Sequence, residues 1–207
     1  ASGLASSAVG FRNKAASENA SAVGYGNNAN ALAASAVGYN NTAGGVGSST
    51  IGYNNTATNE NASAFGYGNT AGGLASSAFG FSNTASGDNA NAFGYNNIAS
   101  GSKSNVFGTG NTVSGSSSTA VGTANEVAAE NSTAIGNNNT ISSGAENSAA
   151  LGNNISISLK DSVALGNNST ATAINSVTGN SSYTKWAGVS DVVGVVSVGS
   201  SGATRQI

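Results

Sequence analysis

Residues 63–67 read Ser-Ala-Phe-Gly-Tyr, and variants of this phrase recur along most of the chain. Each copy has a glycine at the same place, 14 residues after the previous one, apart from a single step of 16. These repeat glycines are Gly10, Gly24, Gly38, Gly52, Gly66, Gly80, Gly94, Gly108, Gly122, Gly136, Gly152 and Gly166. A fixed period of this kind predicts an array of identical structural units.

Other positions keep the same phase as the glycine. The residue before it is apolar in all twelve copies, and the residue two before it is Ala in ten. The fifth residue after it is always Ala, Val or Ile, and the third is Asn in ten copies. So many positions in phase predict that equivalent residues lie above one another in a stack.

One repeat is too short for two helices, but it fits two strands of four or five residues and two tight turns. Asn40-Asn41 falls at one turn and Gly44-Gly45 at the other, and both residue types tolerate the left-handed backbone of a sharp corner. Because every coil repeats the direction of the last, the strands must pair in parallel. We therefore predict an all-β, parallel β-solenoid of 14-residue coils.

A coil of this size is thin. Its interior has room for small side chains, so we expect the residues two before and five after each glycine to form the core. The larger apolar residue directly before each glycine then needs cover from outside the coil. Symmetric association of identical chains is the usual source of such cover, and we expect a homo-oligomer.

The composition excludes several functions. Charged residues make up 7 % of the 207 residues and the net charge is −2, which gives little attraction for nucleic acid. There is no Cys or His, which excludes thiolate and imidazole chemistry, and we expect no cofactor or metal. Glu18 and Glu60 share a repeat position but lie three coils apart, too far for an acid–base pair. Asp88, Asp161 and Asp191 share no repeat position, unlike the periodic Asp of calcium-binding rolls. We expect no enzyme activity.

Eleven of the thirteen aromatic residues flank a repeat glycine. Tyr25, Tyr39, Tyr53 and Tyr67 follow consecutive glycines and predict a ladder along the stack. Two interpretations stay open, because the ladder could pack between subunits or contact a ligand. Beyond residue 95 the same position is Thr or Asn, so one end of the array is aromatic and the other polar.

Three copies also carry a family resemblance. They read Asn-Ser-Thr-Ala-Ile-Gly at 131–136, Asn-Ser-Ala-Ala-Leu-Gly at 147–152 and Asp-Ser-Val-Ala-Leu-Gly at 161–166. These copies resemble the head repeat of YadA-like trimeric autotransporter adhesins, and residues 195–207 resemble the neck of the same family. The resemblance implies a left-handed β-roll head over residues 1–171, assembled as a homotrimer.

The resemblance also implies an order of segments along the chain. A junction containing Trp186 would occupy residues 172–194, and a neck containing Arg205 would begin at 195 and lead to a coiled-coil stalk. We expect the stalk and a membrane anchor to lie outside the sequence given.

The expected function is adhesion at the bacterial cell surface, with the head exposed and the anchor in the outer membrane. Expected partners are host matrix proteins such as collagen, fibronectin or laminin, cell receptors, other cells or abiotic surfaces. Two alternatives stay open. The array could be a structural spacer, or the ladder of Thr42, Thr56, Thr70 and Thr84 could bind ice.

Overall fold

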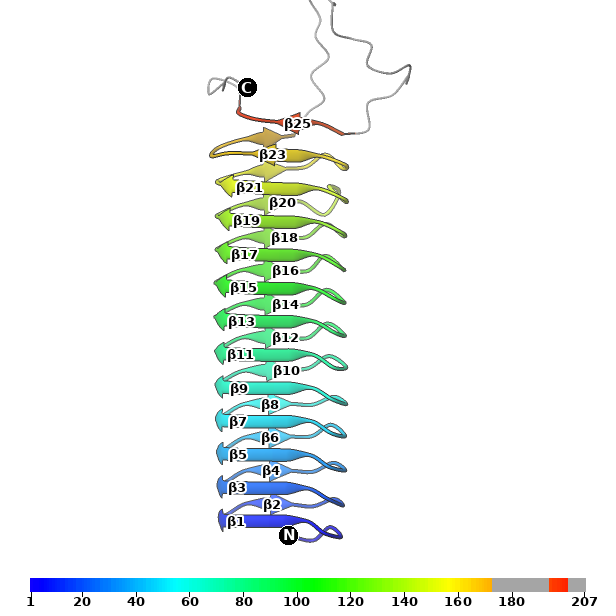
Figure 1. Cartoon of the computed structure of the whole chain (residues 1–207), viewed down its shortest axis with the longest axis vertical. Helices are drawn as coiled ribbons and strands as arrows, with labels where there is room; N and C mark the ends of the chain where they lie inside the picture. The colour runs from blue at the N-terminus through cyan, green and yellow to red at the C-terminus, as the bar shows by residue number, and fades with distance from the viewer. Residues whose placement is uncertain (173–193, 201–207) are drawn as a thin grey trace, which may run out of the picture.

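A computed structural model describes residues 1–172 and 194–200 of the chain. Its described residues form twenty-five strands in two sheets, and every pairing between neighbouring strands is parallel (Figure 1). Strands alternate between the two sheets along the chain, so each coil contributes one strand to each sheet. The prediction of an all-β parallel solenoid is confirmed.

Sheet A contains the longer strands. In order they are β1 (Ser7–Phe11), β3 (Ser21–Tyr25), β5 (Ser35–Tyr39), β7 (Ser49–Tyr53), β9 (Ser63–Tyr67), β11 (Ser77–Phe81), β13 (Asn91–Tyr95), β15 (Asn105–Thr109), β17 (Thr119–Thr123), β19 (Thr133–Asn137), β21 (Ala149–Asn153), β23 (Val163–Leu165) and β25 (Val196–Ser197). From β1 to β23 each strand pairs with the equivalent residues of the next copy, so the sequence repeat fixes the register.

Sheet B contains strands of two residues. They are β2 (Lys14–Ala15), β4 (Asn28–Ala29), β6 (Thr42–Ala43), β8 (Thr56–Ala57), β10 (Thr70–Ala71), β12 (Thr84–Ala85), β14 (Ile98–Ala99), β16 (Thr112–Val113), β18 (Glu126–Val127), β20 (Thr140–Ile141), β22 (Ser156–Ile157) and β24 (Thr170–Ala171). The prediction of two strands of four or five residues was therefore wrong for this sheet. In each coil, the residues that were predicted to lengthen this strand form a wider second corner instead.

The two corners of a coil differ in length. In the coil of β9, residues 68–69 join it to β10, whereas residues 72–76 lead on to β11. Each corner has one residue with a left-handed backbone, such as Asn40 at the first (φ 52°) and Gly47 at the second (φ 64°). The predicted corners are correct, but neither Gly44 nor Gly45 has positive φ, so the left-handed residue of that corner is Gly47.

The repeat glycine has a separate reason to be glycine. Gly66 has a φ of 119°, which L side chains rarely adopt, and a Cβ there would lie 2.1 Å from the carbonyl oxygen of Gly80 in the next coil. The side chain is therefore excluded both by the backbone angle and by the stacked coil.

The core lies between the two sheets. The residues two before and five after each repeat glycine are fully buried from Ala15 onward, as predicted. They form two apolar clusters, one spanning Ala15 to Ala43 and one spanning Ala57 to Ala171. Thr50, a buried polar residue at one of these positions, lies between the two clusters.

A ladder of buried Asn side chains also runs through the interior, which the sequence analysis did not predict. They stand three residues after ten of the twelve repeat glycines. In Asn41, for example, the amide Nδ2 donates to Oδ1 of Asn27, to the Val37 carbonyl and to the Gly52 carbonyl. The backbone N–H of Asn41 donates to the same Oδ1 of Asn27, at 3.1 Å. The ladder is Asn13, Asn27, Asn41, Asn55, Asn69, Asn83, Asn97, Asn111, Asn125 and Asn139. Asn13, in the first coil, is only partly buried, but from Asn27 onward these side chains are buried and satisfy polar groups inside the core.

The roll changes near its C-terminal end. Residues 142–147 contain the two-residue insertion, which forms a turn in which the N–H of Ala145 donates to the Ser142 carbonyl. After residues 173–193, β25 adds a further strand to sheet A beside β23, and the Val195 N–H donates to Ser162 Oγ at 3.1 Å. The start of the segment compared with the neck therefore lies on the roll. The boundaries predicted for junction and neck stay predictions, since residues 173–193 and 201–207 lie outside the described part.

Candidate functional site

The residues directly after the first seven repeat glycines form a column of stacked rings, which we call the aromatic stack. Its members are Phe11, Tyr25, Tyr39, Tyr53, Tyr67, Phe81 and Tyr95. Ring centroids of neighbours are 4.7–5.5 Å apart, and the planes of Tyr39, Tyr53 and Tyr67 differ by only 2–3°. The spacing follows from the distance between paired strands of sheet A.

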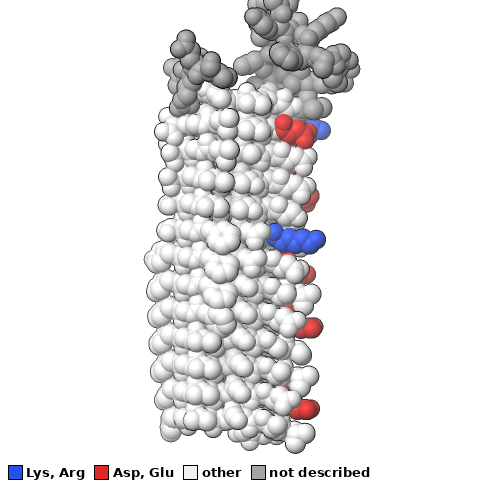
Figure 2. Space-filling view, viewed as in Figure 1, with Lys and Arg blue, Asp and Glu red and all other residues white. Residues whose placement is uncertain are grey.

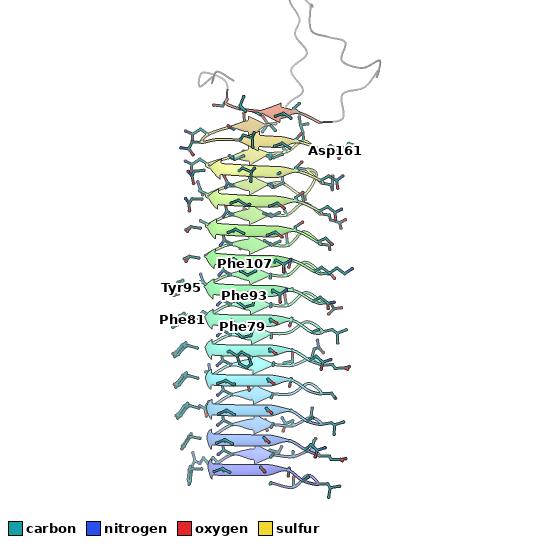
Figure 3. The ribbon with its side chains drawn as sticks, viewed as in Figure 1. Phe79, Phe81, Phe93, Tyr95, Phe107 and Asp161 are labelled. Atoms are coloured by element: carbon teal, nitrogen blue, oxygen red, sulfur yellow. The ribbon has the colours of Figure 1, made fainter. Side chains whose placement is uncertain are left out.

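The stack lies on the surface of the chain. Tyr39, Tyr53 and Tyr67 are 40–47 % exposed. Figure 3 shows Phe81 and Tyr95 projecting beyond one edge of sheet A. Because the ring faces are covered by the rings above and below, the column presents ring edges and phenolic hydroxyl groups to its surroundings. Such a surface can make many small lateral contacts, and the predicted ligand ladder is brought together as one continuous strip.

A second column lies on the outer face of sheet A, formed by the apolar residue before each glycine. We call it the apolar column: Val9, Val23, Val37, Ile51, Phe65, Phe79, Phe93, Phe107, Val121, Ile135, Leu151 and Leu165. All twelve are partly or largely exposed in the single chain, and the exposed fraction is 50 % for Ile51 and 59 % for Val9 in the first coil. Figure 3 places Phe79, Phe93 and Phe107 on the face of the sheet. A continuous apolar strip on this scale is typical of an interaction surface.

Charged side chains gather on the edge of the roll that lies opposite the aromatic stack (Figure 2 and Figure 3). The chain has eight carboxylates, and seven of them lie in the described residues because Asp191 does not. Five of the seven are six residues before a repeat glycine: Glu18, Glu60, Asp88, Glu130 and Glu146. Lys160 occupies the same position, and Lys103 and Asp161 are one residue further on. We call these residues the charged edge.

The charged edge was not predicted, although the repeat contains the signal for it. Aligning the carboxylates on the glycine phase, instead of counting them as scattered, would have placed them in one column. A charged edge is costly to remove from water, so it limits which faces of the chain can be covered by another subunit.

The remaining predicted residues do not form a further binding surface in the part of the chain that the structure describes. Thr42, Thr56, Thr70 and Thr84 do pair in sequence along sheet B, but Asn28 and the exposed Ile98 bound this ladder. The ladder is therefore four rungs long, and ice binding is not favoured. The repeat glycines form a backbone column whose role is structural. Trp186 and Arg205 lie outside the described residues.

The part of the chain that the structure describes contains no candidate metal site. Within residues 1–172 and 194–200, no three His, Cys, Asp or Glu side chains are grouped so that they could hold a metal ion. In the same residues, none of the secondary structure is a helix of the length and hydropathy needed to cross a membrane.

The geometry defines a class, a β-solenoid whose chemistry lies in columns of repeated surface side chains. The comparison with family models agrees. The model for the YadA head domain repeat, described as two copies, matches residues 1–27, 15–41, 43–69, 71–97, 114–139 and 160–177. These segments cover more than half of the chain, which belongs to the YadA head family and is a YadA-like head of a trimeric autotransporter adhesin. No curated protein matches the chain significantly.

The family fixes the function at a coarse level. A YadA head is an adhesin domain that is displayed outside the cell, and the family is not a known family of enzymes. The two longest gaps between matched segments are residues 98–113 and 140–159. The second of these gaps contains the two-residue insertion.

Proposed function

We propose that three copies of this chain assemble with their apolar columns facing a common axis. The observation that carries the proposal is the exposure of every member of that column along the whole roll. Covering these side chains removes apolar surface from water, and each large side chain contributes on the order of 1.5–3 kcal/mol when fully buried. The charged edge and the polar outer face of sheet B remain in solvent, where charges are least costly.

We also propose how the trimer adheres. The lateral surface of several coils acts at once, and Tyr25, Tyr39, Tyr53 and Tyr67 supply the contacts. Each contact is weak, but stacking copies them along the chain and the trimer multiplies them again. The proposed partners are host matrix proteins such as collagen, fibronectin or laminin, cell receptors, other cells or abiotic surfaces, with no part for nucleic acid. The proposed anchor in the outer membrane belongs to a segment C-terminal to the neck.

The first experiment tests assembly. Phe79→Asp/Phe93→Asp places two charges on the apolar column, and Thr70→Asp/Thr84→Asp places two on the outer face of sheet B at neighbouring coils. Multi-angle light scattering at micromolar concentration should find a trimer for the wild type and the threonine variant. The phenylalanine variant should dissociate or fail to assemble. A stable wild-type monomer would overturn the proposed trimer.

The second experiment tests adhesion. The purified head is presented to a panel of collagen, fibronectin, laminin and an abiotic surface, at low and high salt. Replacing one, two and then four of the stack tyrosines by Ser should reduce binding in steps. Salt should have little effect, because few ion pairs are available to be screened. Loss of all binding from one tyrosine would indicate a discrete site, and unchanged binding after four would assign the stack to packing.

A further inference from the structure

The run Tyr25, Tyr39, Tyr53 and Tyr67 is unusual in its chemistry as well as in its shape. Neighbouring rings are 4.9–5.0 Å apart between centroids, with interplanar angles of 2–7°. Because the rings are nearly parallel and related by one coil, equivalent ring carbons are separated by about the same distance. The carbons ortho to each phenolic oxygen therefore face their counterparts in the next coil.

We propose that this run is a site of oxidative modification, in which adjacent tyrosines couple to dityrosine and join neighbouring coils covalently. The oxidant is hydrogen peroxide activated by a haem peroxidase. The peroxidase removes one hydrogen atom from each of two phenols, and hydrogen peroxide is reduced to two molecules of water. The two phenoxyl radicals form one carbon–carbon bond between ortho positions, and each ring regains aromaticity by moving the ortho hydrogen to its oxygen.

The composition directs oxidation to these rings. The chain has no Cys, no Met and no His, and it has a single Trp. The side chains that ordinarily consume oxidants first are thus missing, and the tyrosines take their place. Exposure of 40–47 % at Tyr39, Tyr53 and Tyr67 gives the oxidant access and gives each ring room to tilt toward its neighbour.

Stacking also favours coupling within one chain. Two radicals on adjacent coils are held together by the paired strands β5 and β7, so their effective concentration greatly exceeds that of radicals on separate molecules. The bond closes a loop of one repeat. It would limit the unfolded chain in the way that a disulfide does, in a protein that has no cysteine.

One tyrosine of the aromatic stack serves as an internal control for coupling between neighbours. Tyr95 has Phe81 on one side and Thr109 on the other, so it has no tyrosine neighbour on its own chain. The variant Tyr39→Phe/Tyr67→Phe keeps every ring of the stack but leaves no two tyrosines adjacent. Phe11 and Phe81 already occupy the same column, so the fold should tolerate this change.

The experiment treats the folded head with peroxidase and hydrogen peroxide. Tyr183→Phe is included in every variant, so that all remaining tyrosines belong to the stack. The expected result is the blue dityrosine fluorescence, a loss of two hydrogen atoms per bond in the mass of the chain, and migration as a single chain on a denaturing gel. Thermal unfolding of the treated head should shift to higher temperature.

The variants decide the origin of the signal. Tyr95→Phe should leave the dityrosine yield unchanged, whereas Tyr39→Phe/Tyr67→Phe should lower it to that of N-acetyltyrosine at equal tyrosine concentration. The proposal is overturned if the second variant retains the yield, or if dityrosine appears only in covalent oligomers. It is also overturned if the wild type forms none while N-acetyltyrosine couples under the same conditions. Binding to the adhesion panel is a separate measurement, so either proposal can fail alone.

Discussion

The N-terminal and C-terminal halves of the roll differ in the residues at the stack position and in the residues of the core. Coils from Gly10 to Gly94, the aromatic half, have the aromatic stack outside and mainly Ala inside. Coils from Gly108 to Gly166, the polar half, have Thr or Asn at the stack position. Their core also contains apolar residues larger than Ala, which are Val106, Val113, Val127, Ile141, Ile155 and Ile157.

The polar half also replaces ring stacking by hydrogen bonds. Asn137 Nδ2 donates to Asn153 Oδ1, and Asn153 Nδ2 donates to Asn167 Oδ1, each at 2.8 Å. These residues continue the column that aromatic rings occupy nearer the N-terminus. One backbone repeat thus supports two distributions of apolar volume. We infer that the polar half holds its stability inside the single chain, whereas the aromatic half depends more on contacts at its surface.

The largest effect should come from emptying the core of the polar half. Ile141 is fully buried and Ala134 is the other core residue of its coil. Ile141→Ala should lower the free energy of unfolding by about 2–5 kcal/mol, the usual cost of the lost burial plus the cavity. Chemical denaturation at fixed protein concentration measures this. A loss under about 1 kcal/mol would mean that the coil collapses around the gap.

Overfilling the aromatic half should cost less. Ala64 is fully buried, and the apolar residue that faces it from sheet B in the same coil is the equally small Ala71. Ala64→Leu should therefore destabilise the head by about 1–3 kcal/mol. Thr70→Leu, on the outer face of sheet B in the same coil, is the matched control and should change stability by less than about 0.5 kcal/mol. An unchanged melting midpoint for Ala64→Leu would contradict the assigned interior.

Interrupting the stack tests the surface contribution directly. Tyr53 stacks on Tyr39 and Tyr67, and each such contact is worth roughly 0.5–1.5 kcal/mol beyond area burial. Tyr53→Ser should therefore cost about 1–3 kcal/mol in chemical denaturation, toward the lower end because the rings are partly exposed. Tyr53→Phe should be neutral. Equal losses in both variants would assign the effect to the hydroxyl group.

The smallest effect should be a gain. Thr50 separates the two apolar clusters, and its hydroxyl makes one long hydrogen bond, to the Ser35 carbonyl at 3.4 Å. Thr50→Val keeps the shape and replaces the hydroxyl by a methyl group, so the free energy of unfolding should rise by up to about 1 kcal/mol. A loss of stability in thermal unfolding would show that the hydroxyl is needed.

The sequence was sufficient for the features that depend on phase. The coils, the register, the buried Ala positions and the column of Tyr25 to Tyr67 all follow from a period of 14, since stacked coils align equivalent residues. The two-residue strands of sheet B were not predicted, because Thr-Ala pairs such as Thr70-Ala71 do not show where pairing ends.

Two further features depend on the three-dimensional structure for a different reason. Asn at the position of Asn69 suits a turn and equally suits a buried hydrogen-bonding position, and composition does not separate these cases. The glycine phase aligns Glu60 and Asp88 in one column, but whether this column points outward depends on the direction of the corners that carry the two residues. A corner's direction is set by its backbone angles, which a residue list does not give.

The amide dipoles of the buried Asn ladder are aligned along the axis of the roll. Every amide from Asn27 to Asn139 donates through Nδ2 to the Oδ1 of the coil before it, so the side-chain dipoles all point the same way along the axis. Aligned dipoles polarise one another and add, as peptide dipoles do in a helix. At the far end the Ile155 N–H donates to Asn139 Oδ1 at 3.0 Å, and an apolar side chain follows in place of another amide. Ile155 therefore caps the negative end of this side-chain macrodipole.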